Sequence, residues 1–110
     1  MIDHVLHALV EPRRRAILCL INAEERSAGE IAAHFAVTRP AISQHLQVLS
    51  EAGLVTVRSQ GTRRYYHARP EGLAELRHFL DGFWADHLQV LKQEAEAEER
   101  KIEAGDDTAI

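Results

Sequence analysis

The amino-acid sequence predicts a mainly α-helical fold with one small β-hairpin. Three observations support this. Apolar residues recur at helical spacing near both ends of the chain, a tight turn joins two short helical segments in the middle, and two β-prone runs flank a glycine directly after them. With 110 residues, the chain has the length of one domain. A monomer of this size buries a limited core, so pairing with a second copy would add stability.

The first part of the chain carries the signals of three helices. The first is expected over residues 2–10, and Pro12 suits the first turn of a second helix that runs to about Ala23. Ser27, followed three residues later by Glu30, predicts a capping box that opens a short third helix. The apolar residues expected on the inner sides of these helices are Ile2, Val5, Leu6, Leu9, Ala16, Ile17, Leu20, Ile21, Ile31, Ala32 and Phe35.

A tight connection separates the third helix from the fourth. Thr38 is a favourable N-cap and Pro40 fits within the first helical turn, where its missing N–H is tolerated. The fourth helix is therefore expected from about Arg39 to Ala52, where Gly53 stops it. Two short helices joined by such a turn form a helix-turn-helix.

Two short strands are expected directly after this motif. The runs LVTVR and RRYYHA surround SQGT, which supplies a turn containing Gly61. A β-hairpin in this position is a wing, so the predicted architecture is a winged helix-turn-helix with the order α-α-α-α-β-β-α. Pro70 and Glu71 then open a long last helix. Its apolar positions are Leu73, Leu76, Phe79, Leu80, Phe83, Trp84, Leu88 and Leu91.

The charges of the chain are unevenly distributed. The net charge of −4 is unfavourable for binding nucleic acid. However, residues 12–69 carry nine Lys or Arg and four acidic residues, whereas residues 70–110 carry four basic and eleven acidic ones. A basic middle segment permits phosphate binding on one face of the molecule. Residues 93–110 are mostly charged or alanine and are interpreted as a frayed or disordered tail.

The fourth helix is expected to present one face to the core and one to a ligand. On a helical wheel, Ile42, Leu46 and Leu49 fall on the core side. Polar residues outside this stripe can hydrogen-bond to base edges or phosphates, and the N-terminal end is where recognition helices enter the major groove. An ordinary surface helix with solvated polar side chains is the alternative. The DNA-binding residues predicted here are Thr38, Arg39, Ser43, Gln44, His45 and Gln47.

The predicted wing places Arg58, Arg63 and Arg64 beside a flexible tip. Arginine on a thin projection can enter a narrow minor groove, so these three residues are also predicted to bind DNA. Charge on an edge strand can alternatively serve to prevent aggregation. Alternation along RRYYHA puts Arg64 and Tyr66 on one face and Arg63 and Tyr65 on the other, so only some of these arginines can point toward DNA.

Several short motifs occur together between residues 25 and 68. A Ser-x-His-Leu element covers residues 43–46, Ala-Gly-Leu-Val follows at 52–55, and the tyrosine pair Tyr65-Tyr66 comes after the glycine turn. In combination these motifs resemble the ArsR/SmtB family of winged helix-turn-helix repressors, and residues 9–21 resemble the family's opening helices. The resemblance extends over about residues 2–92. It implies a homodimer, built by the first and last helices, that represses transcription by occupying a near-palindromic operator on double-stranded DNA.

The expected dimer interface uses apolar residues of the first and last helices. Large aromatic side chains are unfavourable to expose, which supports an interface on the last helix. The same aromatic group could instead line a cavity for an unknown small-molecule effector. Residues 1–92 are expected to form one domain for both DNA binding and dimerisation. The predicted interface residues are Val5, Leu6, Leu9, Phe79, Phe83, Trp84, Leu88 and Leu91.

Many members of this family sense metals, but two of its ligand patterns are absent from this sequence. The stretch AGEIAAHF lacks the cysteine pair of the arsenical type, and the last helix lacks an Asp-x-His element. We therefore expect no metal and no cofactor. A site between subunits, formed by His4, His7 and His87, remains an alternative. Cys19 lies in an apolar run and is expected to act as a small apolar side chain, with redox sensing as the alternative.

The sequence thus favours a DNA-binding repressor whose operator can include its own promoter. A winged-helix protein-interaction module that does not bind DNA and a metal- or redox-responsive repressor are the alternatives. An enzyme is not expected, because the chain has no phosphate loop and no nucleophile–base arrangement. No apolar run approaches the roughly 20 residues that span a bilayer, and the first residues do not resemble a secretory signal. With a single cysteine, the expected location is the cytoplasm.

Overall fold

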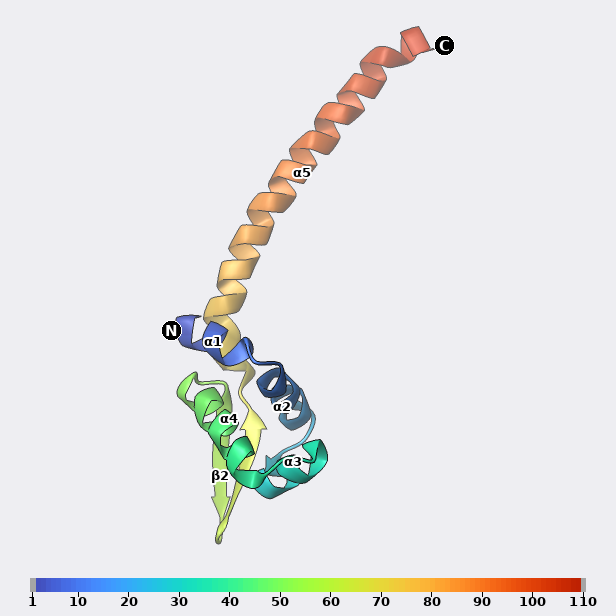
Figure 1. The fold of residues 1–110 in the computed structure, drawn as a ribbon. Helices are drawn as coiled ribbons and strands as arrows, with labels where there is room; N and C mark the ends of the chain where they lie inside the picture. Colours follow the sequence, from blue (N-terminus) through green and yellow to red (C-terminus); the bar gives the residue numbers. More distant parts are fainter. Residues whose placement is uncertain (1, 110) are drawn as a thin grey trace. The chain divides into compact units, whose positions relative to one another are not determined.

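The computed structural model describes residues 2–109, with side chains for residues 2–102. The chain forms two compact units, Met1–Leu76 and Arg77–Ile110. The elements are α1 (Ile2–Leu9), α2 (Pro12–Ala23), β1 (Arg26–Ser27), α3 (Ala28–Phe35), α4 (Arg39–Glu51), β2 (Val55–Gln60), β3 (Arg63–Ala68), the 3-10 helix η1 (Pro70–Leu73) and α5 (Ala74–Ala109). Their order confirms the winged helix-turn-helix, in which α3 and α4 form the helix-turn-helix and β2 and β3 form the wing (Figure 1).

Local side-chain caps begin the helices where the sequence predicts them. Ser27 Oγ accepts a hydrogen bond from the Glu30 amide, and Glu30 Oε1 accepts one from the Ser27 amide, both at 3.2 Å, which confirms the capping box. Thr38 Oγ1 accepts a bond from the Ala41 amide at 3.4 Å and is the N-cap of α4. Gly53, at φ 76°, follows the last turn of α4 in a left-handed conformation that glycine adopts without strain.

The core of the first unit lies between the helices and the inner face of the sheet. The predicted inner residues of α4, Ile42, Leu46 and Leu49, are at most 1% exposed. Each such aliphatic side chain contributes about 1.5–3 kcal/mol relative to its exposed state. The other large side chains that are fully buried are Ile17, Ile21, Ile31 and Leu54.

Two residues of α2 differ from expectation. Ala16, which was expected on the inner side of the helix, and Cys19, which was expected to act as a small apolar side chain, are both exposed. The reason is helical geometry, because Ile17 and Ile21 occupy the core side of α2 and a residue two positions after Ile17 is rotated by about 200° from it. Cys19 therefore does not act as a buried core residue in this unit.

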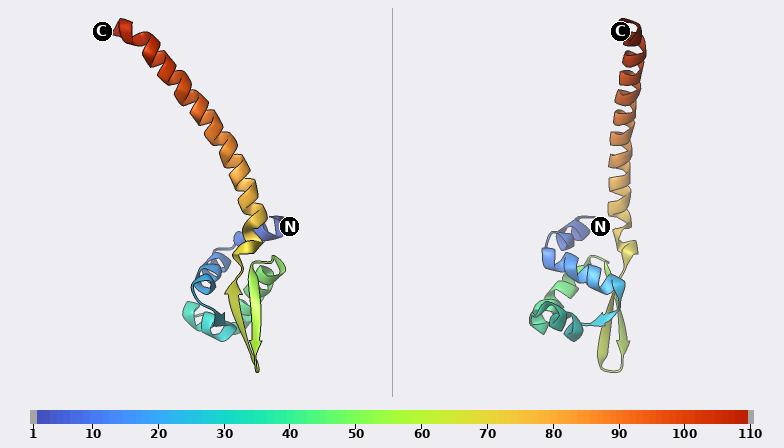
Figure 2. Two further views of the ribbon diagram at one scale, coloured as in Figure 1. Left: turned by 180° about the vertical axis from the view of Figure 1, so that it is seen from behind. Right: turned by 90° about the vertical axis from the view of Figure 1, so that its right-hand side faces the viewer.

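The sheet has three strands in the order β1-β3-β2, all antiparallel. Strand β1 is an addition to the predicted hairpin, and pairs Arg26 with Tyr66 and Ser27 with Tyr65. Two residues carry no periodic pattern, so the sequence could not reveal a strand of this length. The hairpin reaches past α3 and α4 in every view, as a wing does (Figure 2).

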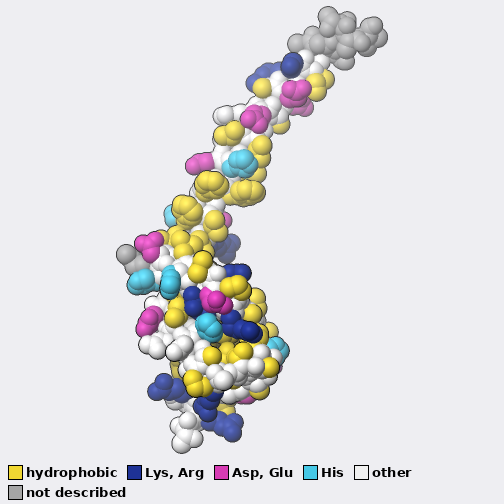
Figure 3. All heavy atoms as spheres, viewed as in Figure 1, with side chains coloured by type: hydrophobic (Ala, Val, Ile, Leu, Met, Phe, Trp, Pro, Cys, Tyr) yellow, Lys and Arg dark blue, Asp and Glu magenta, His cyan; other side chains and the backbone are white. Residues whose placement is uncertain are grey.

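The second unit consists of the remainder of α5, which is helical to Ala109. The frayed or disordered tail expected from residue 93 stays a prediction, because a helix at the end of a chain can still fray. Alanine, glutamate, lysine and arginine are strong helix formers, which explains a helix in so charged a segment. The first part of this unit exposes apolar side chains (Figure 3). Those at least 45% exposed are Phe79, Leu80, Phe83, Trp84, Leu88, Val90 and Leu91.

Candidate nucleic-acid interface

Helix α4 presents polar residues to solvent along the side opposite its core stripe. Arg39, Ser43, Gln44 and Gln47 are exposed, and His45 on the flank is half-buried. Gln47 Nε2 donates a hydrogen bond to Glu51 Oε1 at 3.3 Å, one helical turn away, whereas no side-chain hydrogen bond occupies Gln44 among the described residues. The helix that the sequence predicts for base reading is therefore accessible along its outer face.

A groove of about 670 Å³ lies between the start of α3, the start of α4 and the wing. It brings together four of the predicted DNA-binding residues, Arg39, Ser43, Arg63 and Arg64, which come from two elements. The other residues that line it are Ser27, Ala28, Gly29, Glu30, Thr62 and Tyr66. The sequence did not single these out as DNA-binding, because none of them is basic and none lies in the predicted recognition helix.

The register of the wing decides which arginines reach this groove. Cross-strand partners share a face, so the pairing of Ser59 with Arg64 and of Arg58 with Tyr65 assigns Arg64 and Arg58 to opposite faces. Arg63 was expected on the face opposite Arg64, yet both line the groove. Arg63 directly follows the turn, where a two-stranded ribbon twists strongly and a long side chain can reach around its edge.

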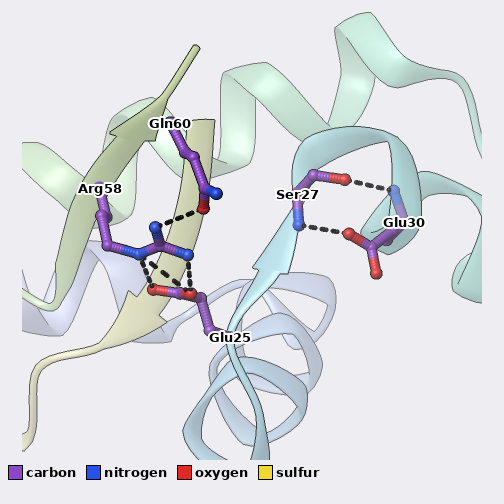
Figure 4. Close-up of polar contacts among 5 residues, drawn as sticks. All are labelled: Glu25, Ser27, Glu30, Arg58 and Gln60. Carbon is purple, nitrogen blue, oxygen red and sulfur yellow. Dashed lines mark hydrogen bonds and ion pairs between the residues drawn. The ribbon is translucent and has the colours of Figure 1, made fainter. Parts of the chain in front are cut away.

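Arg58 lies on the other face and is bound within the protein. Its Nε and Nη2 donate to both carboxylate oxygens of Glu25, at 3.1 Å to Oε2 and 2.6 Å to Oε1 (Figure 4). Its Nη1 donates to Gln60 Oε1 at 2.8 Å, and its guanidinium carbon lies 4.9 Å from the centre of the Tyr65 ring. The Arg58 guanidinium lowers the pKa of the Glu25 carboxyl through these hydrogen bonds. To bind DNA as predicted, Arg58 would therefore have to leave these hydrogen-bond partners.

Other arginines of the basic middle segment are also used inside the fold. Arg14 Nε donates to the carbonyl of Ala8 at 2.7 Å, and Arg15 Nη1 donates to that of Leu9 at 2.8 Å. Both arginines therefore satisfy the last carbonyl groups of α1. Arg13 lies over the ring of Phe35, 5.1 Å from its centre. Basic side chains also gather around the wing (Figure 3).

Glu30 adds one negative charge to this groove. Hydrogen bonds from the backbone and side chain of Ser27 lower the pKa of Glu30, so its carboxylate is ionised at neutral pH. The carboxylate is directed back to the Ser27 amide at 3.2 Å, as Figure 4 shows. Its charge is partly offset by Arg63 and Arg26, which act on it electrostatically.

The residues predicted for the dimer interface differ in exposure. Val5 is 3% exposed and packs in the core of its own subunit, which leaves it little surface for a partner. Leu9 is also partly buried against that core, whereas Leu6 is 48% exposed. The five predicted residues of α5, which belong to the second unit, are all exposed, as given above.

Histidine and cysteine residues occur near two smaller cavities of the first unit. His4 and His7 line one of about 270 Å³ together with Glu51, and Cys19 lines an apolar one of about 210 Å³ together with Leu54. Among the described side chains, no group of three or more His, Cys, Asp or Glu is arranged to hold a metal ion. His87 lies in the second unit, 5.4 Å from Trp84 between ring centres.

None of the helices over residues 2–109 combines the length and apolarity that crossing a membrane requires.

Similar sequences are regulators of transcription. The chain is 43% identical over 106 residues to the HTH-type transcriptional regulator Rv2034 of Mycobacterium tuberculosis, which covers 96% of this chain and 94% of the relative. It is 38% identical over 64 residues to the transcriptional repressor SdpR of Bacillus subtilis, covering 58% of this chain and 71% of the relative.

Solved structures agree with these relatives in fold. A possible transcriptional regulator for arsenical resistance has 48% identity and a TM-score of 0.65, and the match covers 81% of this chain and 93% of that one. A homodimeric winged helix-turn-helix DNA-binding domain from Mycobacterium bovis has 34% identity and a TM-score of 0.62, and the match covers 79% of this chain and 81% of that one. The model of the bacterial regulatory proteins of the arsR family matches residues 11–57, which include the helix-turn-helix. With a relative matched almost end to end and this family model on the DNA-binding motif, the chain belongs to the arsR family of bacterial transcription regulators.

Proposed function

We propose that the protein is a homodimeric repressor that acts in the bacterial cytoplasm on a near-palindromic operator. The observation that carries the proposal is the groove between α3, α4 and the wing, where Arg39, Ser43, Arg63 and Arg64 meet. Arginine and serine side chains are common donors to phosphate oxygens, and the start of α4 adds the positive end of a helix dipole. One strand of the duplex backbone fits this chemistry.

Base reading is assigned to the outer face of α4. With the phosphate backbone in the groove, α4 enters the major groove by its N-terminal end. Gln44 can then offer its amide as a paired donor and acceptor to an adenine edge, and Ser43 can bind either a base or a phosphate. Gln47 can take part once it releases Glu51.

Dimerisation supplies the second half-site. The exposed aromatic and aliphatic side chains of α5 form a surface that a second copy would cover, and Leu6 of α1 is a further exposed apolar residue that we assign to the dimer. The homodimeric state of the relative from Mycobacterium bovis supports this arrangement. Two recognition helices in a symmetric dimer bind half-sites about 34–36 Å apart, or multiples of that distance. Residues 1–92 are the segment that carries both functions in this proposal.

Repression follows from occupancy of the operator and involves no catalytic step and no cofactor. The protein is also proposed to bind DNA without metal. An effector that released DNA would have to favour one state of the dimer over the other by its differential affinity. The chain lacks the two ligand patterns that would make zinc or arsenite obvious candidates.

The test is a gel-shift titration with the DNA upstream of the gene, against a scrambled duplex of equal composition. Repression requires tighter binding to the upstream DNA, and less transcript from it when the protein is added in vitro. Arg39→Ala, in the groove, should weaken binding, whereas Arg77→Ala, on the exposed surface of α5, should not. Equal affinity for both duplexes would exclude a specific repressor, and a rise in transcript would make the protein an activator.

Metal dependence is tested in the same assay with zinc, nickel, cadmium and arsenite, each with a chelator control. A tenfold loss of DNA affinity at stoichiometric metal, equivalent to about 1.4 kcal/mol, would contradict the proposal if His87→Ala abolished it. Unchanged affinity throughout is the expected result.

A further inference from the structure

Arg58 makes polar or aromatic contacts with three other side chains at once. Two of its nitrogens bind both oxygens of the Glu25 carboxylate, a third binds Gln60, and the guanidinium lies over the Tyr65 ring (Figure 4). A two-point arginine–carboxylate pair fixes orientation as well as distance, which single-point surface pairs do not. The Arg58 side chain remains 51% exposed and that of Glu25 33%, so water and salt can still compete with the pair.

The pair joins two segments that are 33 residues apart in sequence. Glu25 lies in the connection between α2 and β1, whereas Arg58 lies in the middle of β2, on the edge of the sheet away from β1. Strand β1 itself reaches β3 through the pairs Arg26 with Tyr66 and Ser27 with Tyr65. The ion pair therefore spans β3 and ties the far strand of the wing to the helical body.

We propose that Glu25 and Arg58 hold the wing at a fixed angle to the helix-turn-helix, and that Arg58 is a positioning residue of the wing. This inference rests on the proposed function for its effect on DNA binding, but the restraint itself exists without DNA. By holding β2, the pair keeps Arg63 and Arg64, at the far end of the same hairpin, beside Arg39 and Ser43 in the groove. A wing held in place loses less conformational freedom when it binds.

Removing Glu25 distinguishes this positioning role from a direct DNA contact, because the two roles predict opposite changes in DNA affinity. If Arg58 bound a phosphate, removing Glu25 would release the guanidinium and tighten binding. If Arg58 positions the wing, removing Glu25 loosens the hairpin and weakens binding as much as removing Arg58. Glu24→Ala is the matched control, because it removes the same charge from the neighbouring residue, whose contact to Arg26 is longer, at 3.7 Å.

The experiment compares Glu25→Ala, Arg58→Ala, the double alanine variant and the charge swap Glu25→Arg with Arg58→Glu, all in the full chain. Hydrogen exchange of the amides of residues 57–66 is measured without DNA. Affinity for the upstream DNA is measured as a function of salt. Each single variant should speed exchange by roughly two- to fivefold, the range expected for an exposed ion pair, with the double variant no faster than either. The charge swap should restore slow exchange and DNA affinity.

DNA binding should weaken equally in Glu25→Ala and Arg58→Ala relative to Glu24→Ala, with an unchanged salt slope. Unaltered exchange in both single variants would overturn the restraint. Tighter binding by Glu25→Ala, together with a salt slope lower by about one in Arg58→Ala, would overturn the positioning role and make Arg58 a phosphate contact. A wild-type protein that bound no DNA would refute the proposed function. The hydrogen-exchange data, which are measured without DNA, would then still test whether the ion pair restrains the wing.

Discussion

The backbone of Gly72 lies directly against the carbonyl group of Gly53. A Cβ atom at residue 72 would overlap the carbonyl oxygen of Gly53 and lie 2.8 Å from its carbonyl carbon. The same carbonyl oxygen accepts a hydrogen bond from Arg69 Nη1 at 3.2 Å. The contact packs η1 onto the turn that ends α4, so the end of the recognition helix is held by a segment that follows the wing.

Gly72→Ala should therefore destabilise the protein by about 1–3 kcal/mol, because backbone atoms must move to admit the methyl group. Urea unfolding at fixed protein concentration measures this, since dimerisation makes stability depend on concentration. Gly29→Ala is the control in the same unit, where the nearest side-chain atom is 4.0 Å from the added Cβ. Equal stability of the two variants would show that the Gly53 turn can shift at little cost.

Gln44→Ala should weaken operator binding by about 1–3 kcal/mol and relax the preference at one base pair, because a paired amide contact to a base edge is lost. The measurement is affinity for the operator and for its single-base variants. Gln93→Ala, the same change on exposed α5, should leave affinity unchanged. If Gln44→Ala binds every sequence as the wild type does, α4 does not read bases through this residue.

Replacing Arg63 and Arg64 together by alanine should lower the salt slope of DNA binding by about two, since each phosphate contact contributes about one. Affinity is measured across a range of salt concentrations on operator and random DNA. The double variant Arg77→Ala with Arg100→Ala removes the same charge from α5. A slope that falls equally in both double variants would indicate a general effect of charge and no specific contact by the wing.

Trp84→Glu should dissociate the proposed dimer, because a charge would replace an aromatic side chain in the surface that we assign to the partner subunit. Trp84 is 57% exposed in the single chain. Analytical sedimentation at micromolar protein concentration measures the oligomeric state. Gln93→Glu introduces the same charge nine residues later, about two and a half turns away on the opposite side of the helix, and should stay dimeric. A Trp84→Glu protein that remained dimeric would place the interface elsewhere.

The capping box of α3 should lose stability in acid. Hydrogen bonds from Ser27 lower the pKa of Glu30 in the folded state below its ordinary value of 4.5. Its ionised form therefore stabilises the fold above about pH 4.5, and this contribution is lost as the pH falls through the lower folded pKa. The melting temperatures of wild type and Glu30→Gln should differ at pH 7, and the difference should shrink as the solution is made more acidic. For Glu98→Gln, in the middle of α5, we expect a smaller difference at pH 7. A Glu30→Gln difference that persisted unchanged in acid would contradict this linkage.

Elements that have local signals could be predicted from the amino-acid sequence alone. Thr38 and Pro40 mark the start of α4, and its buried stripe of Ile42, Leu46 and Leu49 follows from helical periodicity. Gly61 marks the turn of the wing. Caps, periodicity and turn residues act over a few positions, so they can be recognised without knowing the rest of the fold. The family resemblance then related these elements to DNA.

Contacts between distant residues became known from the packing of the whole fold. Local patterns could not reveal that Glu25 accepts hydrogen bonds from Arg58. They also could not reveal that Gly72 packs on Gly53, or that Arg63 lines the same groove as Arg39. Exposure of Cys19 likewise depended on which side of α2 the core covers, and an apolar run does not specify that side. Periodicity limits which face of an element is buried, whereas the partner on that face depends on how all the elements pack together.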